Sequence, residues 1–102
     1  MRDNVLSLLS LAYRAGKVKS GSFATKEAVR AGEASLVIGA LDASDNTRKK
    51  LRDMCNHYGV SLLEYGTAQG IGAAIGKENR VCAAVTDEGF ARQLLVKSGA
   101  DR

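Results

Sequence analysis

Apolar residues recur along the chain in two alternating patterns. In five longer segments they are spaced three or four residues apart, as at Val5, Leu8, Leu9 and Ala12, which is the spacing of one face of an α-helix. Between these segments lie four short apolar runs of strand length. The pattern predicts helices over residues 3–15, 22–31, 44–58, 67–75 and 87–98, and strands at residue 18 and over residues 35–41, 60–65 and 81–85.

Polar residues and glycines mark the ends of the expected helices. Serine, threonine, aspartate and asparagine can accept a hydrogen bond from a free N–H group of the first turn, and glycine tolerates the backbone conformation that ends a helix. The expected caps are Asp3 or Asn4, Ser22, Ser44 with Asp45, Thr67, and Thr86 or Asp87, and the expected ends are Gly16, Gly32, Gly59, Gly76 and Gly99.

The alternation of helices and strands predicts an α/β sandwich, with helices on both faces of a small central sheet. Residues 35–41 are largely apolar at successive positions, as is typical of a strand covered on both faces. In the third helix, a stripe of Leu51, Met54, Cys55 and Tyr58 is expected to face inward. The connections are short, so residues 1–102 are expected to form one domain.

The composition narrows the class of protein. Of 102 residues, 45% are apolar and 25% charged, as in ordinary globular domains, and the lack of proline and tryptophan points to an aliphatic core. No apolar run approaches the roughly 18 residues of a membrane span. No cleavable signal follows Met1, so we expect a cytoplasmic protein whose two cysteines, Cys55 and Cys82, are free thiols.

The net charge of +4 is concentrated in the first third of the chain. Five basic residues and a single acidic one lie between Arg14 and Arg30. Such a segment suits a polyanion such as RNA, DNA or a membrane surface, although it is equally typical of a solvated face. Lys17 and Lys19 flank the expected start of a helix at Ser22, where free N–H groups can bind phosphate.

No group of residues in the sequence has the spacing of a catalytic site. The glycine-rich stretch 70–77 lacks a third small residue where Ile75 stands, and Glu78 follows its lysine where a phosphate loop needs serine or threonine. Cys55 and His57 are two positions apart on a helix, so their side chains diverge. We therefore expect no enzyme activity, no cofactor and no metal.

Several segments, in their order and spacing, resemble a known family. They are residues 11–17, 20–21, 34–38, 42–44, 70–77 and 81–85. Together they resemble the ribosomal-protein family of L-seven-Ae and L-thirty-e, and its small bacterial branch in particular, over nearly the whole chain. The resemblance implies a three-layer α-β-α sandwich with a central four-stranded mixed sheet. It also implies a non-enzymatic RNA-binding domain whose partner is structured RNA, such as rRNA or another kink-turn RNA, with no membrane partner and a monomeric state.

In this family, the start of the second helix contacts the kink-turn. Gly21 matches the glycine of the family pattern and Ser22 its free position, but Phe23 replaces a polar residue, Ala24 replaces glutamate or glutamine, and Glu27 replaces lysine. The nearby Lys26 is displaced by one position, or about 100° around the helix.

A second family contact is the loop that enters the last strand, where Arg80 and Val81 fit the expected basic and apolar roles, and a third is at Ala43 and Ser44. An alternative is a protein-interaction module that has lost the kink-turn contacts and exposes Phe23. The RNA-binding residues implied by the basic segment and the resemblance are Lys17, Lys19, Gly21, Ser22, Lys26, Arg80 and Val81.

Overall fold

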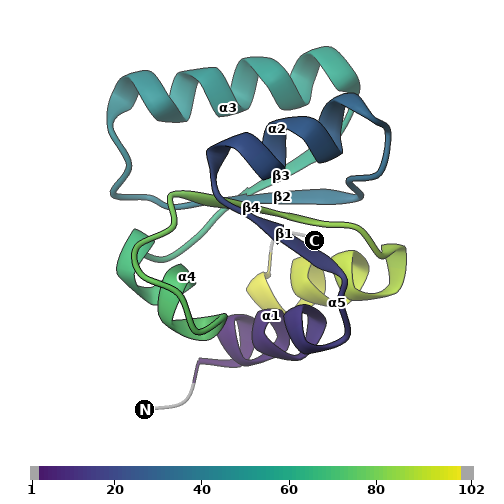
Figure 1. The fold of residues 1–102 in the computed structure, drawn as a ribbon, viewed down its shortest axis with the longest axis vertical. Helices are drawn as coiled ribbons and strands as arrows, with labels where there is room; N and C mark the ends of the chain where they lie inside the picture. Colours follow the sequence, from purple (N-terminus) through teal and green to yellow (C-terminus); the bar gives the residue numbers. More distant parts are fainter. Residues whose placement is uncertain (1–2, 100–102) are drawn as a thin grey trace.

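The computed structural model describes residues 3–99 and contains the expected alternation of helices and strands (Figure 1). Each predicted element is present, with bounds that differ from the predicted ones by a few residues at most. The elements are α1 (Asn4–Arg14), β1 (Val18–Ser20), α2 (Ser22–Arg30), β2 (Leu36–Gly39), α3 (Asp45–Tyr58), β3 (Ser61–Glu64), α4 (Ala68–Ala74), β4 (Cys82–Val85) and α5 (Glu88–Ser98).

The four strands form one mixed sheet in the order β1-β4-β2-β3. Strands β2 and β3 are parallel, whereas β4 is antiparallel to both of its neighbours, β1 and β2. The register pairs Ser20 with Ala83 and Gly39 with Cys82. The last residues of β1, β2 and β3 and the first residue of β4 therefore all lie at one end of the strands. We call this the α2 end of the sheet.

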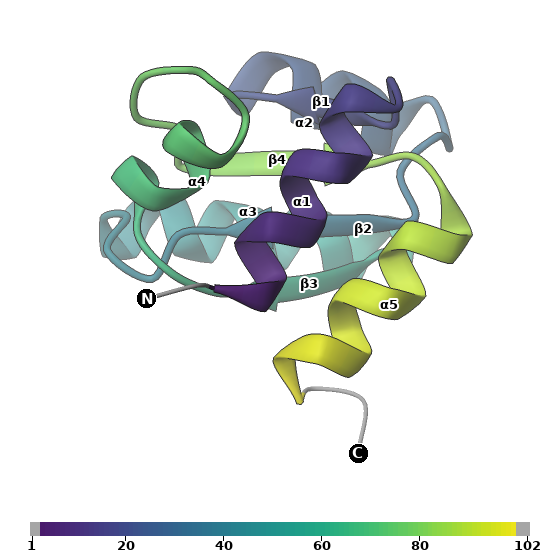
Figure 2. The same ribbon diagram turned by 90° about the horizontal axis from the view of Figure 1, so that it is seen from below.

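Helices cover both faces of the sheet, which confirms the three-layer sandwich. Helices α2 and α3 lie on one face, and α1, α4 and α5 on the other, with α1 between α4 and α5 (Figures 1 and 2). Strand β2 is buried on both faces, as expected: Leu36 and Ile38 belong to the larger core against α1, α4 and α5, and Val37 to the smaller core against α2 and α3. Within residues 3–99, no helix has both the length and the apolar character needed to cross a membrane.

Four helices begin with the side-chain caps that the sequence predicts. Asp3, Ser44, Thr67 and Asp87 each accept a hydrogen bond from the N–H group three residues later. The prediction for Ser22 was wrong, because Ser22 is the first residue of α2 and the capping position is Gly21. Gly21 has a φ of 92°, which favours glycine, and it has no side chain that could cap the helix.

The inward stripe of α3 is shorter than predicted. Leu51 and Cys55 are buried, but Tyr58 is 45% exposed, and its ring meets the His57 ring edge to face with 4.8 Å between the ring centroids. Tyr58 is the last residue of α3, and Gly59 turns the chain out of the helix directly after it, so fewer neighbours surround Tyr58 than surround Leu51 and Cys55.

Candidate nucleic-acid interface

The start of α2 and the loop before β4 lie side by side at the α2 end of the sheet. The N–H group of Gly21 donates a 2.9 Å hydrogen bond to the carbonyl oxygen of Cys82 and so joins the two segments. Between them is an open groove of about 510 Å³, which we call the interface groove. It is lined by Ser20, Gly21, Ser22, Phe23, Ala24, Asn79, Arg80 and Val81. The structure thus brings together four of the residues expected to bind RNA, namely Gly21, Ser22, Arg80 and Val81.

The loop before β4 is held in place by close contact with α4. A Cβ atom on Gly72 would overlap the carbonyl oxygen of Glu78, so the loop backbone packs directly on the helix backbone. The N–H group of Arg80 donates to the carbonyl oxygen of Ala68 at 3.0 Å. The carbonyl oxygen of Val81 accepts from the N–H group of Ala40 at 2.8 Å. The glycine-rich stretch of the sequence therefore serves close packing, and this packing positions Arg80 and Val81.

Arg80 and Phe23 present a basic and an aromatic side chain to the interface groove. The Cδ and Nε atoms of Arg80 would both lie 3.9 Å from a Cβ atom on Gly21, so the side chain runs along the start of α2. Its Nη1 atom donates to the carbonyl oxygen of Asn79 at 3.1 Å. Phe23 is 77% exposed, which is a large apolar exposure for a side chain at the edge of a groove. Val81 is half-buried and packs against both cores.

The buried side of the interface contains the thiol of Cys82. Burial raises the pKa of this thiol, and the hydroxyl groups of Thr25 and Ser22 oppose the effect only in part. Burial also raises the pKa of the Cys55 thiol, to about 11, and Cys82 adds to the shift. Both cysteines are free thiols, as the sequence indicates, and neither is poised for nucleophilic chemistry. No cluster of histidine, cysteine or acidic side chains that could hold a metal occurs within residues 3–99.

The expected lysines do not gather at the interface groove. Lys19 is exposed in the middle of β1, opposite Ala84. Lys17 precedes β1, and its carbonyl oxygen accepts from the N–H group of Thr86 at 2.8 Å. That places the Lys17 backbone at the opposite end of the sheet, about 13 Å from Gly21, since a strand advances about 3.3 Å per residue. Sequence proximity between Lys17 and Ser22 was therefore misleading, because an extended strand separates them.

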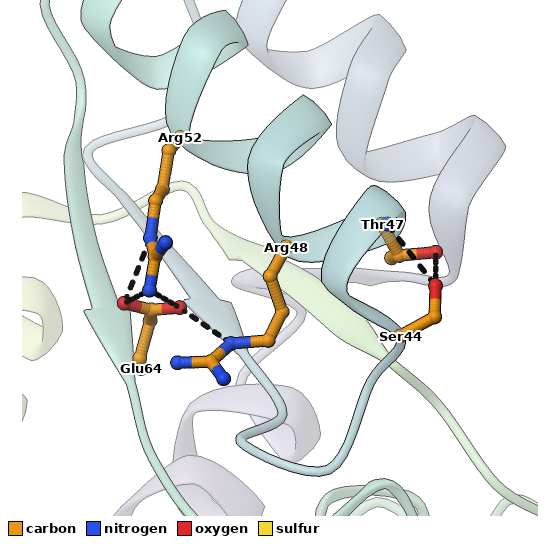
Figure 3. Close-up of polar contacts among 5 residues, drawn as sticks. All are labelled: Ser44, Thr47, Arg48, Arg52 and Glu64. Atoms are coloured by element: carbon orange, nitrogen blue, oxygen red, sulfur yellow. Dashed lines mark hydrogen bonds and ion pairs between the residues drawn. The ribbon is translucent and has the colours of Figure 1, made fainter.

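Lys26 lies further along α2 and lines a second groove, between α2 and α3. This groove also contains two residues that the sequence analysis did not select, Thr47 and Lys50. The basic residues at positions 48–52 of α3 are a signal in the sequence that could have pointed to Lys50. The sequence alone does not show which of these side chains are neutralised by ion pairs. Figure 3 shows two of them, Arg48 and Arg52, at the carboxylate of Glu64.

Two arginines of α3 are held by one carboxylate of β3. The Nε atom of Arg48 lies 3.1 Å from Oε2 of Glu64, and Arg52 donates to both carboxylate oxygens at 3.0 to 3.2 Å (Figure 3). Desolvation by itself would raise the pKa of Glu64, but the hydrogen bonds and charges of Arg52 and Arg48 outweigh it and lower the pKa. Lys49 pairs with Asp53 at 2.7 Å. Lys50 has no ion pair with any residue in the range 3–99.

The sequence of the chain matches the model of a known protein family. The model of the ribosomal protein L7Ae/L30e/S12e/Gadd45 family matches residues 3–95. The chain belongs to this family. The L7Ae/L30e/S12e/Gadd45 assignment confirms the resemblance seen in the sequence.

Two bacterial relatives of the chain are named as RNA-binding proteins. The RNA-binding protein YlxQ of Bacillus subtilis is 47% identical over 88 residues, which cover 86% of this chain and 88% of that protein. The RNA-binding protein YlxQ of Enterococcus faecium is 38% identical over 92 residues, which cover 90% and 88%. The family and these relatives are named as ribosomal or RNA-binding proteins, in agreement with the expectation that the chain is not an enzyme.

A solved structure has the same fold. A protein from Bacillus halodurans, described as having unknown function, superposes with a TM-score of 0.89 at 41% identity. The superposition covers 94% of this chain and 97% of that chain. The fold that positions the interface groove is therefore shared by this solved protein.

Proposed function

We propose that this protein binds structured RNA through the interface groove, and that kink-turn RNA, in rRNA or elsewhere, is the preferred class. In this proposal the protein acts in the cytoplasm as a monomer and needs no cofactor. The relatives named as RNA-binding proteins and the ribosomal-protein family support this assignment.

The observation that carries the proposal is the uncapped start of α2. The first N–H groups of any helix have no partner within the helix, and in α1, α3, α4 and α5 a side chain satisfies one of them. In the part of the chain that the structure describes, no side chain caps α2 in this way, and Arg80 lies beside the start of the helix. Free N–H groups, the helix dipole and a guanidinium together favour a phosphate group at this position.

The exposed ring of Phe23 suits RNA with unpaired bases. Proteins that recognise RNA commonly stack such bases on aromatic side chains. Phe23 and Val81 line the same groove and supply apolar surface on its two sides. Ala24 has no hydrogen-bonding side chain, and the exposed Glu27 repels phosphate, so recognition here depends more on stacking and phosphate contacts than on polar contacts from α2.

The 77% exposure of Phe23 also favours a second candidate, a protein-interaction module on the same fold. Exposed aromatic residues are frequent anchors of protein interfaces. The two candidates predict different results in one titration, because only RNA binding depends on the shape of the RNA.

The test is a fluorescence-anisotropy titration of the protein with a kink-turn RNA and with a straight duplex of matched length. RNA binding in the proposed mode predicts a lower Kd for the kink-turn RNA, and salt dependence for both RNAs. Equal affinity for the two RNAs would contradict kink-turn preference and leave RNA binding in place. No binding to either RNA at low salt would contradict the proposed function and favour the protein-interaction module.

A further inference from the structure

The groove between α2 and α3 carries two lysines that face it from different helices. Lys26 of α2 and Lys50 of α3 line it together with Ser22 and Thr47, and its volume is about 270 Å³. Leu51 and Met54 supply the apolar part of its lining. Both helices begin at the α2 end of the sheet, so the groove lies next to the interface groove.

Neither lysine is neutralised within the described part of the chain. The three ion pairs among residues 3–99 use the other basic residues of α3, namely Arg48, Lys49 and Arg52. Glu27 follows Lys26 directly, so it points about 100° away around α2. Because Lys26 and Lys50 both line the groove, an anion held there would be attracted by two positive charges.

Among residues 3–99, the hydroxyl group of Thr47 accepts a hydrogen bond and donates none. Its Oγ1 atom accepts a hydrogen bond from the hydroxyl group of Ser44 at 3.0 Å (Figure 3). The proton of the Thr47 hydroxyl is therefore available to a ligand oxygen. Two ammonium groups and a hydroxyl beside apolar surface match the oxygens of a phosphate group better than they match an apolar ligand.

The two grooves are continuous at Ser22, which lines both of them. A strand that places one phosphate at the start of α2 can therefore continue into the α2–α3 groove. We propose that this groove binds the sugar-phosphate backbone of the same RNA strand, with Lys26, Lys50 and Thr47 as its phosphate contacts. This inference rests on the proposed function, and it adds a subsite formed by α3.

Adjacent lysines on α3 give a matched test of this subsite. Lys50→Ala removes a groove lysine, whereas Lys49→Ala removes an exposed lysine that is paired with Asp53. The affinity for a kink-turn RNA is measured for both variants and the parent over a series of KCl concentrations. Lys50→Ala is expected to weaken binding about fivefold and to lower the slope of log K against log salt by about 0.7 to 0.9, because one phosphate contact is lost.

The control Lys49→Ala is expected to change the Kd by less than about twofold. Equal effects of the two variants, or an unchanged salt slope in Lys50→Ala, would overturn the subsite. The double variant Lys26→Ala with Lys50→Ala should lower the slope by about twice as much as Lys50→Ala alone, and no additional decrease would also contradict a shared strand. A parent protein that binds no RNA would instead overturn the proposed function, so the two failures can be told apart.

Discussion

The backbone hydrogen bond from Gly21 to Cys82 joins the start of α2 to the first residue of β4 at 2.9 Å. These residues are far apart in sequence, yet the bond fixes the two sides of the interface groove relative to each other. Because backbone atoms make the link, substitutions of the exposed side chains leave it intact. The side chains of the groove can therefore be tested one at a time.

Arg80→Ala is expected to weaken binding of a kink-turn RNA about tenfold, because it removes a charge-assisted contact beside the uncapped start of α2. The measurement is the Kd at low salt. Arg92→Ala is the matched control, since Arg92 is an exposed arginine of α5, which begins beyond the opposite end of the sheet. Similar losses in the two variants would mean that general charge, and not the groove, governs binding.

Lys17 and Lys19 provide a second comparison along one strand. Charge reversal of both is expected to weaken RNA binding at least about tenfold at low salt. The single variants should divide this loss unequally, with Lys19→Glu the larger, because Lys17 precedes β1 and lies at the end of the sheet opposite the interface groove. A larger effect of Lys17→Glu would place the RNA at the opposite end of the sheet.

Ala24→Glu combined with Glu27→Lys introduces the polar pattern that the family has at these positions. Ala24 lines the interface groove and Glu27 is exposed on the same helix, so both new side chains have room. Each regained base contact is expected to add about 1–3 kcal/mol of binding free energy. The gain should appear with kink-turn RNA and be absent with the straight duplex. An equal gain with both RNAs would reflect charge alone.

Gly72→Ala is expected to lower the free energy of unfolding by about 1–3 kcal/mol, because its Cβ atom would overlap the backbone of Glu78. Displacement of the loop should also weaken RNA binding through Arg80. Gly70→Ala is the control on the same helix, where the nearest atom to the new Cβ is the Thr67 hydroxyl oxygen at 3.2 Å. Urea denaturation measures both variants, and equal stability would show that the contact between α4 and the loop is not tight.

Glu64→Gln tests the paired arginines of α3. Arg52 and Arg48 lower the pKa of Glu64 in the folded state. The ionised carboxylate therefore stabilises the fold at pH values above the pKa that Glu64 has in the unfolded chain. This stabilisation is lost as the pH falls through the lower pKa that Glu64 has in the folded state. The partly exposed pair is expected to contribute less than about 1 kcal/mol at pH 7. The difference in Tm between parent and variant should disappear on acidification. A difference that persists at low pH would mean that packing, and not charge, is responsible.

The order and type of the elements followed from the sequence because they depend on local signals. Ser44, Thr67 and Asp87 cap helices through hydrogen bonds to residues three positions away, and such bonds can be predicted from neighbouring residues. Gly59 and Gly99 end helices in the left-handed conformation, as expected. The buried apolar faces of β2 were likewise apparent in consecutive residues.

The composition of the candidate site was less predictable because it depends on contacts between distant segments. Arg80 was selected from the family pattern, but its position beside Gly21 follows from the pairing of β1 with β4. Lys50 could not be singled out from the sequence, because only the structure shows that Arg48 and Arg52 pair with Glu64 while Lys50 has no ion pair among residues 3–99. Ser22 does not cap α2, because the residue at the capping position is Gly21, which has a positive φ, and Ser22 is already the first residue of the helix.

The position of Lys19 has a further consequence for the solubility of the fold. Strand β1 forms one edge of the sheet, and an edge strand offers unpaired backbone groups to strands of other molecules. With three residues and an exposed lysine at its centre, β1 is a poor template for such pairing. The opposite edge, β3, ends in the ion-paired Glu64. The charges at the two edges thus disfavour sheet-to-sheet aggregation, whether or not RNA is bound.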